Sequence, residues 1–489
     1  MLYDGRTQHI QIVKQEHSDL LTQTGPGTPC GALMRQYWQP IALVDEFNPA
    51  LDPRMATAHG PRPVKAVRAL GQNFVLFQNA PHSANTTNPS PSYGLLDRDC
   101  PHRGADLAFA RYEITVDSAG QTHTGIRCPF HGWKFDSTGQ CLETPAEPLG
   151  SQLCTRIQQR SYPVLEKSGV LFAWLGDGAA PPFPRFDCYS APASHSFAFK
   201  GLWQANWLQA FEVGIDPAHP SFLHRFFNDA GLQDVGDNAA GKQFRSASAG
   251  DADGPMGGQK WPMTRVMREL HRPDIRCEPT PSGMRLTALR QLSDTTMHVR
   301  VTNAIFPHTF VIPLSESMTI TQIHLPVDDT HTYWYSLFTS FAGPVDKEAM
   351  RAQRLQYTTM PDYLPLAGRH NAWGFNPAEQ QTSTFLGMGE DDINVHDQWA
   401  VESMGAVQDR TREHLGTSDK AIMAHRRALH KAIEAVAAGS PAPHCADSAQ
   451  AAQMTGPDTI DGFAPADSWQ GWWQTQAHSK RAAAPWNTP

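Results

Sequence analysis

Two short segments of the sequence each offer one thiol and one imidazole. The first, Cys-Pro-His-Arg-Gly, supplies Cys100 and His102, and the second, Cys-Pro-Phe-His-Gly-Trp, supplies Cys128 and His131. A Cys₂His₂ zinc site could use these donors, but zinc ribbons and fingers more usually pair cysteine with cysteine and histidine with histidine. The mixed pairs favour a [2Fe–2S] cluster with both cysteines on one iron and both histidines on the other. Because imidazole replaces thiolate, such a cluster has a raised reduction potential and can accept an electron.

A second group of donors follows about ninety residues later. It reads Asp216-x-x-His219-x-x-x-x-His224 within the segment NWLQAFEVGIDPAHPSFLHRF. An iron that keeps open positions for dioxygen is typically held by two histidines and one carboxylate. In a chain with 22 histidines, these residues could also be ordinary surface or core side chains. Their position after the first motif favours a metal site.

Composition limits what kind of protein carries these donors. The chain has 489 residues and a formal charge of −8, which argues against nucleic acid or an anionic membrane as the main partner. Apolar runs such as residues 169–176 are far shorter than the roughly 20 residues that span a bilayer. No secretory signal is visible at the N-terminus, and eight cysteines are too few for a disulfide scaffold. We therefore expect a cytoplasmic protein.

The pattern of strands and helices predicts an α+β chain. Short strand-like runs between 63 and 174, separated by turn residues, indicate a small antiparallel β domain that contains the thiol–imidazole segments. Longer strand-like runs fill 283–340, residues 202–212 are helix-like, and 417–438 form a helix that Thr417 or Ser418 can cap. Residues 235–260 are predicted to be a mobile loop. The expected units are an N-terminal segment (1–35), the β domain (36–178), a catalytic domain (179–438) and a Pro/Ala-rich tail (439–489).

The residues around both donor groups resemble a known family. The segments CPHRGADLAFAR and RCPFHGWKFD are similar to the Rieske motif of the Rieske non-haem iron ring-hydroxylating oxygenases. Respiratory Rieske subunits carry a further cysteine in each loop, where this chain has Ala105 and Phe130. Three further segments, GPGTPCGALMRQYWQP, EVGIDPAHPSFLH and VESMGAVQDRTREHLGTSDKAI, resemble the large (alpha) subunit of the phthalate-dioxygenase-type branch. The stretch between His102 and Cys128 is longer than usual, and residues 117–124 are predicted to be an extended hairpin turn.

The resemblance implies a fold and a role for each donor. It implies an antiparallel β Rieske domain and a catalytic domain in which an antiparallel sheet packs against helices, a helix-grip or START-like arrangement. Cys100, His102, Cys128 and His131 would hold the [2Fe–2S] cluster. His219 and His224 would bind a mononuclear Fe(II). Asp216 would bridge His219 and the Rieske His131 of a neighbouring subunit, orienting both rings.

The third iron ligand must come from a distant segment. Residues 393–405 (INVHDQWAVESMG) resemble the carboxylate-bearing helix of the family, and Asp397 occupies the ligand position. Glu390, Asp391 and Asp392 are nearby alternatives, and the adjacent His396 receives no role.

The implied function is that of the terminal oxygenase of a multicomponent system. No GxGxxG fingerprint is present, so NAD(P)H would bind a separate flavin and iron–sulfur reductase. Electron transfer between subunits requires a ring of subunits, and the family resemblance implies that this ring is a homotrimer. The expected reaction uses O₂ to cis-dihydroxylate an aromatic compound, most simply an aromatic carboxylate. The alternatives are aryl-ether O-demethylation with release of formaldehyde and, from another class, an electron-transfer Rieske protein without oxygenase activity.

An aromatic carboxylate requires a cation in the pocket, and arginine suits it through paired hydrogen bonds. The strand region offers Arg285, Arg290 and Arg300 as candidates. Any of them could equally lie on the surface of an open sheet.

Overall fold

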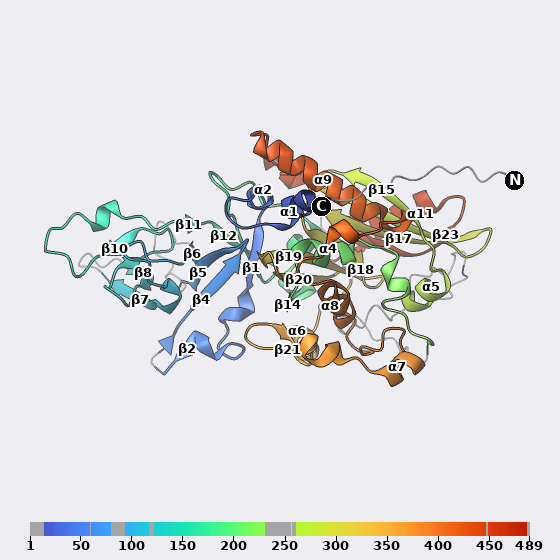
Figure 1. Cartoon of the computed structure of the whole chain (residues 1–489), viewed down its shortest axis with the longest axis horizontal. Coiled ribbons are helices and arrows are strands. Elements are labelled where there is room, and N and C mark those ends of the chain that lie inside the picture. The colour runs from blue at the N-terminus through green and yellow to red at the C-terminus, as the bar shows by residue number, and fades with distance from the viewer. Residues whose placement is uncertain are drawn as a thin grey trace.

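The computed structural model describes residues 14–58, 60–79, 93–116, 122–229, 256, 261–445 and 448–486. Its two β-rich parts lie side by side along the long axis of the molecule (Figure 1). The predicted boundary near 178 falls between the last strand of the first part and the first strand of the second. The hairpin residues 117–121 and most of the predicted loop 235–260 lie outside the described residues.

Within the described residues, the first part is built from three small antiparallel sheets. Their strand orders are β1-β13-β12, β11-β6-β5-β4 and β10-β9-β8-β7. The bounds are β1 (Gln39–Leu43), β4 (Val64–Ala69), β5 (Gln72–Gln78), β6 (Tyr93–Asp97), β7 (Arg111–Val116), β8 (Thr122–Arg127), β9 (Lys134–Phe135), β10 (Cys141–Glu143), β11 (Ser161–Tyr162), β12 (Val164–Lys167) and β13 (Val170–Ala173). The apolar side chains between the second and third sheets surround Cys100 and Cys128. This is the small antiparallel β structure that the sequence predicts.

A single large antiparallel sheet organises the second part. Seven of its described strands follow the order β14-β20-β19-β18-β17-β16-β15, and β23 pairs with β17. The bounds are β14 (Ser196–Trp203), β15 (Asp274–Thr280), β16 (Gly283–Gln291), β17 (Thr296–Ile305), β18 (Thr309–Pro313), β19 (Met318–Asp328), β20 (His331–Ser340) and β23 (Ile460–Pro465). The strand-like runs predicted in 283–340 correspond to β16, β17, β19 and β20.

Helices cover both faces of the large sheet. On one face, Phe211 of α4 (Trp207–Gly214) packs with its ring 6.5 Å from that of Phe310 on β18. A Cβ atom on Gly214 would lie 1.8 Å from the Phe310 ring, so glycine lets the end of α4 approach the sheet. On the other face, Trp473 of α11 (Trp469–Ala483) packs against Val299 and nearby apolar residues. The predicted arrangement of an antiparallel sheet against helices is therefore observed.

The helix expected at 417–438 is α9 (Lys420–Ala437). It begins three residues later than predicted because 417–419 form a 3-10 turn, in which Asp419 accepts a hydrogen bond from the Gly416 amide. Gly439, with φ of 82°, follows its end.

The remaining described elements are short. They are α1 (Gln15–Thr22), α2 (Pro29–Met34), α3 (Asp187–Ser190), α5 (Met263–Glu269), α6 (Lys347–Leu355), α7 (Pro377–Thr382), α8 (Asn394–Ser403), α10 (Ser448–Gln453), β2 (Ala56–Thr57), β3 (Gly60–Pro61), β21 (Thr358–Thr359) and β22 (Leu364–Pro365). Among the helices described, none has the length and apolar character needed to cross a bilayer. The segment 439–489, for which the sequence predicts no element, contains α10, β23 and α11.

Candidate metal centres

The two thiol–imidazole loops have the same backbone geometry. In the first, the Cys100 amide donates to the Ala105 carbonyl at 2.8 Å and the Gly104 amide donates to the Cys100 carbonyl at 2.8 Å. In the second, the amides of Cys128 and Gly132 make the equivalent bonds at 2.8 and 3.0 Å. Both glycines have φ near +75°, a left-handed conformation that glycine adopts without strain. Two matched loops therefore present their donors to the same space.

The four donors meet between these loops. The rings of His102 and His131 lie 4.5 Å apart between centroids, and the Cys128 thiol is near enough to Cys100 to influence its ionisation. Burial, together with the Cys128 thiol, raises the pKa of Cys100 to about 11. Nδ1 of His131 is buried and has no hydrogen-bond partner among the described residues. A buried thiol pair beside an imidazole nitrogen without a partner fits an iron–sulfur cluster at this position.

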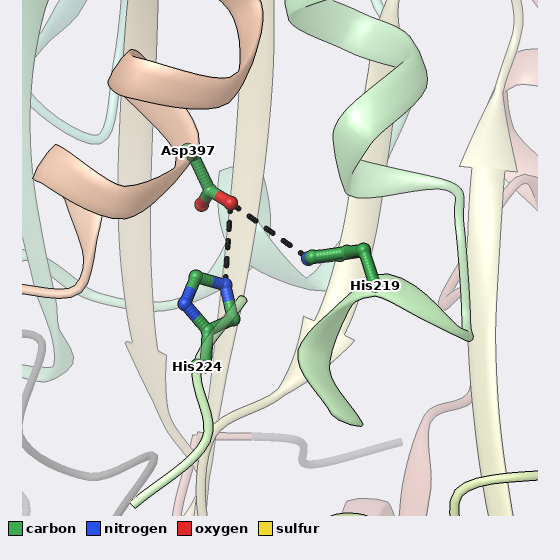
Figure 2. Close-up of side chains that lie close together, drawn as sticks. All are labelled: His219, His224 and Asp397. Atoms are coloured by element: carbon green, nitrogen blue, oxygen red, sulfur yellow. Dashed lines mark ion pairs between the residues drawn. The ribbon is translucent and has the colours of Figure 1, made fainter. Parts of the chain in front are cut away.

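His219, His224 and Asp397 form the second centre. One ligand atom from each residue lies within 4.8 Å of the other two. Oδ1 of Asp397 is 3.2 Å from Nε2 of His224 and 3.7 Å from Nε2 of His219 (Figure 2). Neighbouring ligand atoms of one metal ion lie about 3 Å apart when each bond is about 2.1 Å. The spacing thus fits two histidines and a carboxylate around one iron with open positions.

Electrostatics at this centre favour metal-binding protonation states. Burial alone would raise the pKa of Asp397, but the His224 and His219 imidazoles outweigh it, so the carboxyl pKa lies below its usual range. Burial lowers the pKa of His219. The Asp397 Oδ1 atom is buried and makes no hydrogen bond within the described part of the chain. An ionised carboxylate with such an oxygen, beside a neutral imidazole, fits a bound cation.

Two helices that contact one another deliver these ligands. Asn206 caps α4 by accepting from the Leu208 amide at 3.1 Å, and the chain leaves α4 directly into the turn that carries Asp216 and His219. Asp397 lies in the first turn of α8. Gln209 of α4 donates to the Val401 carbonyl of α8 at 2.8 Å. This contact fixes the carboxylate relative to the histidine turn.

The alternative carboxylates lie elsewhere. Asp392 pairs with Arg354 at 3.1 Å and accepts from the Asn394 amide at the start of α8. Glu390 and Asp391 do not belong to the group of ligand atoms found among the described residues.

Two hydrogen-bond acceptors lie behind the histidine ligands. Nδ1 of His219 lies 2.6 Å from the Asp216 backbone carbonyl, which can only accept, so Nδ1 carries the proton and Nε2 offers a lone pair. Nδ1 of His224 lies 3.2 Å from Nδ1 of His396. Burial lowers the pKa of His396 to about 4, which leaves its ring neutral at neutral pH. The sequence reasoning left His396 without a role, although its place beside Asp397 in a helix was a usable signal.

Asp216 lies at the wall of a large cavity. Its Oδ1 accepts from the Ala218 amide at 2.7 Å, and its Oδ2 is 3.9 Å from Nδ1 of His219. The cavity has a volume of about 840 Å³ and is mostly apolar, and Asp216 and His219 both line it. The contact between Asp216 and His219 is thus made by the backbone carbonyl, while the carboxylate faces the cavity.

Known proteins match most of the chain. The family described as LigXa C-terminal domain like matches residues 173–478, more than half of the chain, and the Rieske [2Fe-2S] domain matches residues 54–162. The oxygenase subunit of tert-butanol monooxygenase / tert-amyl alcohol desaturase from Aquincola tertiaricarbonis is 29% identical over 90% of this chain and 81% of its own. The phthalate 4,5-dioxygenase oxygenase subunit from Pseudomonas putida is 29% identical over 88% of both.

A solved structure shares the fold. Dicamba monooxygenase bound to dicamba superposes with a TM-score of 0.50 at 14% identity, covering 83% of this chain and 98% of that one.

The chain belongs to the Rieske non-haem iron ring-hydroxylating oxygenases of the phthalate-dioxygenase type, with a LigXa-like C-terminal domain. It is a Rieske-type oxygenase whose cofactors are a [2Fe–2S] cluster and a mononuclear iron.

Proposed function

We propose that this oxygenase hydroxylates an aromatic carboxylate, with Cys100, His102, Cys128 and His131 holding the cluster and His219, His224 and Asp397 holding Fe(II). The observation that carries the proposal is the convergence of these last three side chains, whose ligand atoms lie within 4.8 Å of one another. When bound, the cluster supplies electrons and the iron activates dioxygen. The residues of the chain orient these groups, exclude water and position the organic substrate.

Asp216 is proposed to contact His131 of a neighbouring copy. Within one chain, β8, which leads into the Cys128 loop, lies near one end of the molecule, whereas α4 and α8 lie in its middle (Figure 1). The cavity beside Asp216 is rimmed by exposed apolar side chains, including Phe222, Phe385 and Met404, each more than 40% exposed. Exposed apolar surface of this kind is typical of an interface. A cyclic homotrimer gives every chain the same donor and acceptor surfaces.

Electrons are proposed to come from a separate NAD(P)H-dependent reductase with flavin and iron–sulfur centres. The sequence has no GxGxxG fingerprint, so the nicotinamide would bind another protein. Sharing a compartment with that reductase places the oxygenase in the cytoplasm.

Arg290 is the candidate for the substrate carboxylate. Arg300 is neutralised by Asp461 at 2.8 Å, and Arg285 pairs with Glu278 at 3.3 Å and stacks on Trp473. Arg290 is 1% exposed, and its only hydrogen bond to the described residues runs from Nη2 to the Pro217 carbonyl at 2.9 Å.

The remaining donors of Arg290 have no partner among the residues that the structure describes. Its Nε and Nη1 are buried and make no hydrogen bond within the described ranges. Burial, together with nearby Arg300, lowers its pKa to about 10, so the guanidinium stays charged at neutral pH. A buried guanidinium with unsatisfied donors is costly, and an incoming carboxylate would offset that cost. The Pro217 carbonyl that accepts from Arg290 lies two residues before His219, so this hydrogen bond joins the cation to the segment that carries the proposed iron ligands.

The name of one relative supports this substrate class. Phthalate 4,5-dioxygenase is named for an aromatic dicarboxylate. Aryl-ether O-demethylation would use the same two centres and the same cation, and the products distinguish the two reactions.

The test begins with metal analysis of the purified protein. About three irons and two acid-labile sulfides per chain are expected for one cluster plus one iron. Two irons would contradict the mononuclear site and leave an electron-transfer protein. With a reductase and NAD(P)H, aromatic carboxylates should stimulate oxygen uptake, giving a dihydrodiol. Formaldehyde from methoxylated carboxylates would instead establish O-demethylation.

A further inference from the structure

His396 is a buried imidazole that contacts a proposed iron ligand from behind. It is fully buried, and its ring lies nearly parallel to that of His224, with an interplanar angle of 23°. The two Nδ1 atoms are 3.2 Å apart. Since one nitrogen must donate and the other accept, the protons of the two rings are linked.

The hydrogen bond made by Nε2 of His396 decides which of the two Nδ1 atoms is the donor. Its Nε2 lies 2.9 Å from the Gly389 carbonyl oxygen, which only accepts. The proton of the neutral His396 ring is therefore on Nε2, and its Nδ1 is an acceptor. His224 must then donate through Nδ1, which leaves the lone pair of its Nε2 directed toward Asp397, where Oδ1 is 3.2 Å away.

Gly389 is itself held in place. Its amide donates to both carboxylate oxygens of Glu379, in α7, at 3.0 and 3.1 Å. Its φ of 95° is in the region that favours glycine. Hydrogen bonds thus link Glu379 to Gly389, Gly389 to His396 and His396 to His224.

We propose that His396 is a positioning residue that fixes His224 in the tautomer able to bind iron. This inference rests on the proposed iron site. Metal-bound histidines commonly donate their second N–H to a carboxylate, a carbonyl or water, and that partner orients the ring and raises its basicity. Here the partner is a neutral imidazole that directly precedes the ligand Asp397, so one turn of α8 supplies both a ligand and the support of another ligand.

Three substitutions of His396 distinguish the effect of its hydrogen bonds from the effect of its packing. Asparagine places an oxygen near the position of Nδ1, so His396→Asn keeps an acceptor for His224. Glutamine reaches the position of Nε2, so His396→Gln keeps only the bond to Gly389. His396→Phe fills the space without an acceptor. His425→Phe is the control, because His425 is a buried histidine that packs on Phe211.

The measurement is anaerobic release of Fe(II) to a chromogenic chelator, with acid-labile sulfide and the visible spectrum confirming an intact Rieske cluster. We expect His396→Gln and His396→Phe to release the mononuclear iron about 10- to 100-fold faster than the parent protein. His396→Asn and His425→Phe should release iron within about threefold of the parent rate, much more slowly than the other two variants.

Contrary results have separate meanings. If His396→Phe retains iron like the parent, or if His396→Asn loses it as fast as His396→Phe, the tautomer role is wrong. If the parent protein itself contains only two irons per chain, the proposed function fails instead.

Discussion

Asp216 combines two separate tasks in one residue. Its backbone carbonyl accepts a hydrogen bond from the His219 ring at 2.6 Å, while its carboxylate faces the cavity. Substitution of the side chain should therefore leave the iron ligand oriented and remove only the contact proposed with a neighbouring copy. This division makes the bridging role separable from metal binding.

Asp216→Asn should keep about three irons and two sulfides per chain, and its turnover should fall about 100-fold, because an amide replaces the proposed bridging carboxylate. Metal analysis and reductase-coupled oxygen uptake measure the two quantities. Asp419→Asn is the control, since Asp419 also lines the cavity. Undiminished turnover in Asp216→Asn would rule out the bridge.

Arg290→Met should raise the KM for aromatic carboxylates about 10- to 100-fold, because a charge-assisted hydrogen bond is worth about 1.5–3 kcal/mol. The KM for the corresponding methyl esters should change little. Arg285→Met is the matched control, since Arg285 stacks on Trp473 on the outer side of the sheet. Equal effects on acids and esters would show that Arg290 supports the fold and does not recognise the carboxylate.

Residue-level prediction from the sequence succeeds where donors are close together in the chain. His219 and His224 are recognisable together because only four residues separate them. The choice of Asp397 over Glu390, Asp391 and Asp392 rested on resemblance, since the orientation of α8 decides which carboxylate reaches the histidines. Neither the contact of His396 with His224 nor the contact of Arg290 with the Pro217 carbonyl can be predicted, because each joins residues more than seventy positions apart.

At the scale of elements, Glu46 joins the two parts of the molecule. It lies in a 3-10 turn (Val44–Phe47) and forms ion pairs with Lys65 on β4 and with Lys200 on β14, the latter at 2.7 Å. Burial alone would raise its pKa, but Lys200 and Lys65 outweigh burial and lower it to about 2. The ionised carboxylate thus stabilises the junction between the β part and the large sheet.

Glu46→Gln should lower the free energy of unfolding at pH 7 by about 3 kcal/mol, because the buried Lys200 and the partly buried Lys65 lose their partner. The folded pKa of about 2 lies below the ordinary 4.5, so this stabilisation is complete above pH 4.5 and is lost as the pH falls toward 2. The difference from the parent should shrink by about 1 kcal/mol at pH 4. Urea unfolding at both pH values measures it, with exposed Glu147→Gln as control. A difference independent of pH would contradict the role of the ionised carboxylate.

Element prediction worked for long apolar strands and failed at the C-terminus. The runs in β16, β17, β19 and β20 are long and β-branched, so their pattern is visible locally. Strand β23 reads Ile-Asp-Gly-Phe-Ala-Pro, which lacks such a pattern. It is a strand because Asp461 lies opposite Arg300 on β17 and pairs with it.

At the scale of the whole molecule, electron transfer is expected between chains. The cluster loops lie toward one end of each chain and the proposed iron site in its middle (Figure 1). A chain that lacks a cluster would then receive its electrons from the cluster of a neighbouring chain.

Co-expression tests this directly. Cys100→Ser removes a proposed cluster ligand, and Asp397→Ala removes a proposed iron ligand, so each variant alone should be inactive. Mixed trimers of the proposed ring should recover about a third of the parent activity, because whichever variant is present twice, one of the three interfaces pairs an intact cluster with an intact iron site. Purification with two different tags isolates the mixed species, and oxygen uptake measures them. Mixed oligomers without activity would show that each chain uses its own cluster.

Strand β23 comes late in the sequence, so the large sheet cannot be completed until late in synthesis. Until residue 465 has left the ribosome, residues 296–301 of β17 lack the strand that pairs with them beside β18, and Arg300 lacks Asp461. A nascent chain with an open strand edge and an unneutralised internal charge is prone to aggregate. The β part, whose strands end at Ala173, can fold and receive its cluster while translation continues. The interior around Arg290 and Arg300 closes only after residue 465 has been made, so iron–sulfur loading would precede completion of the large sheet.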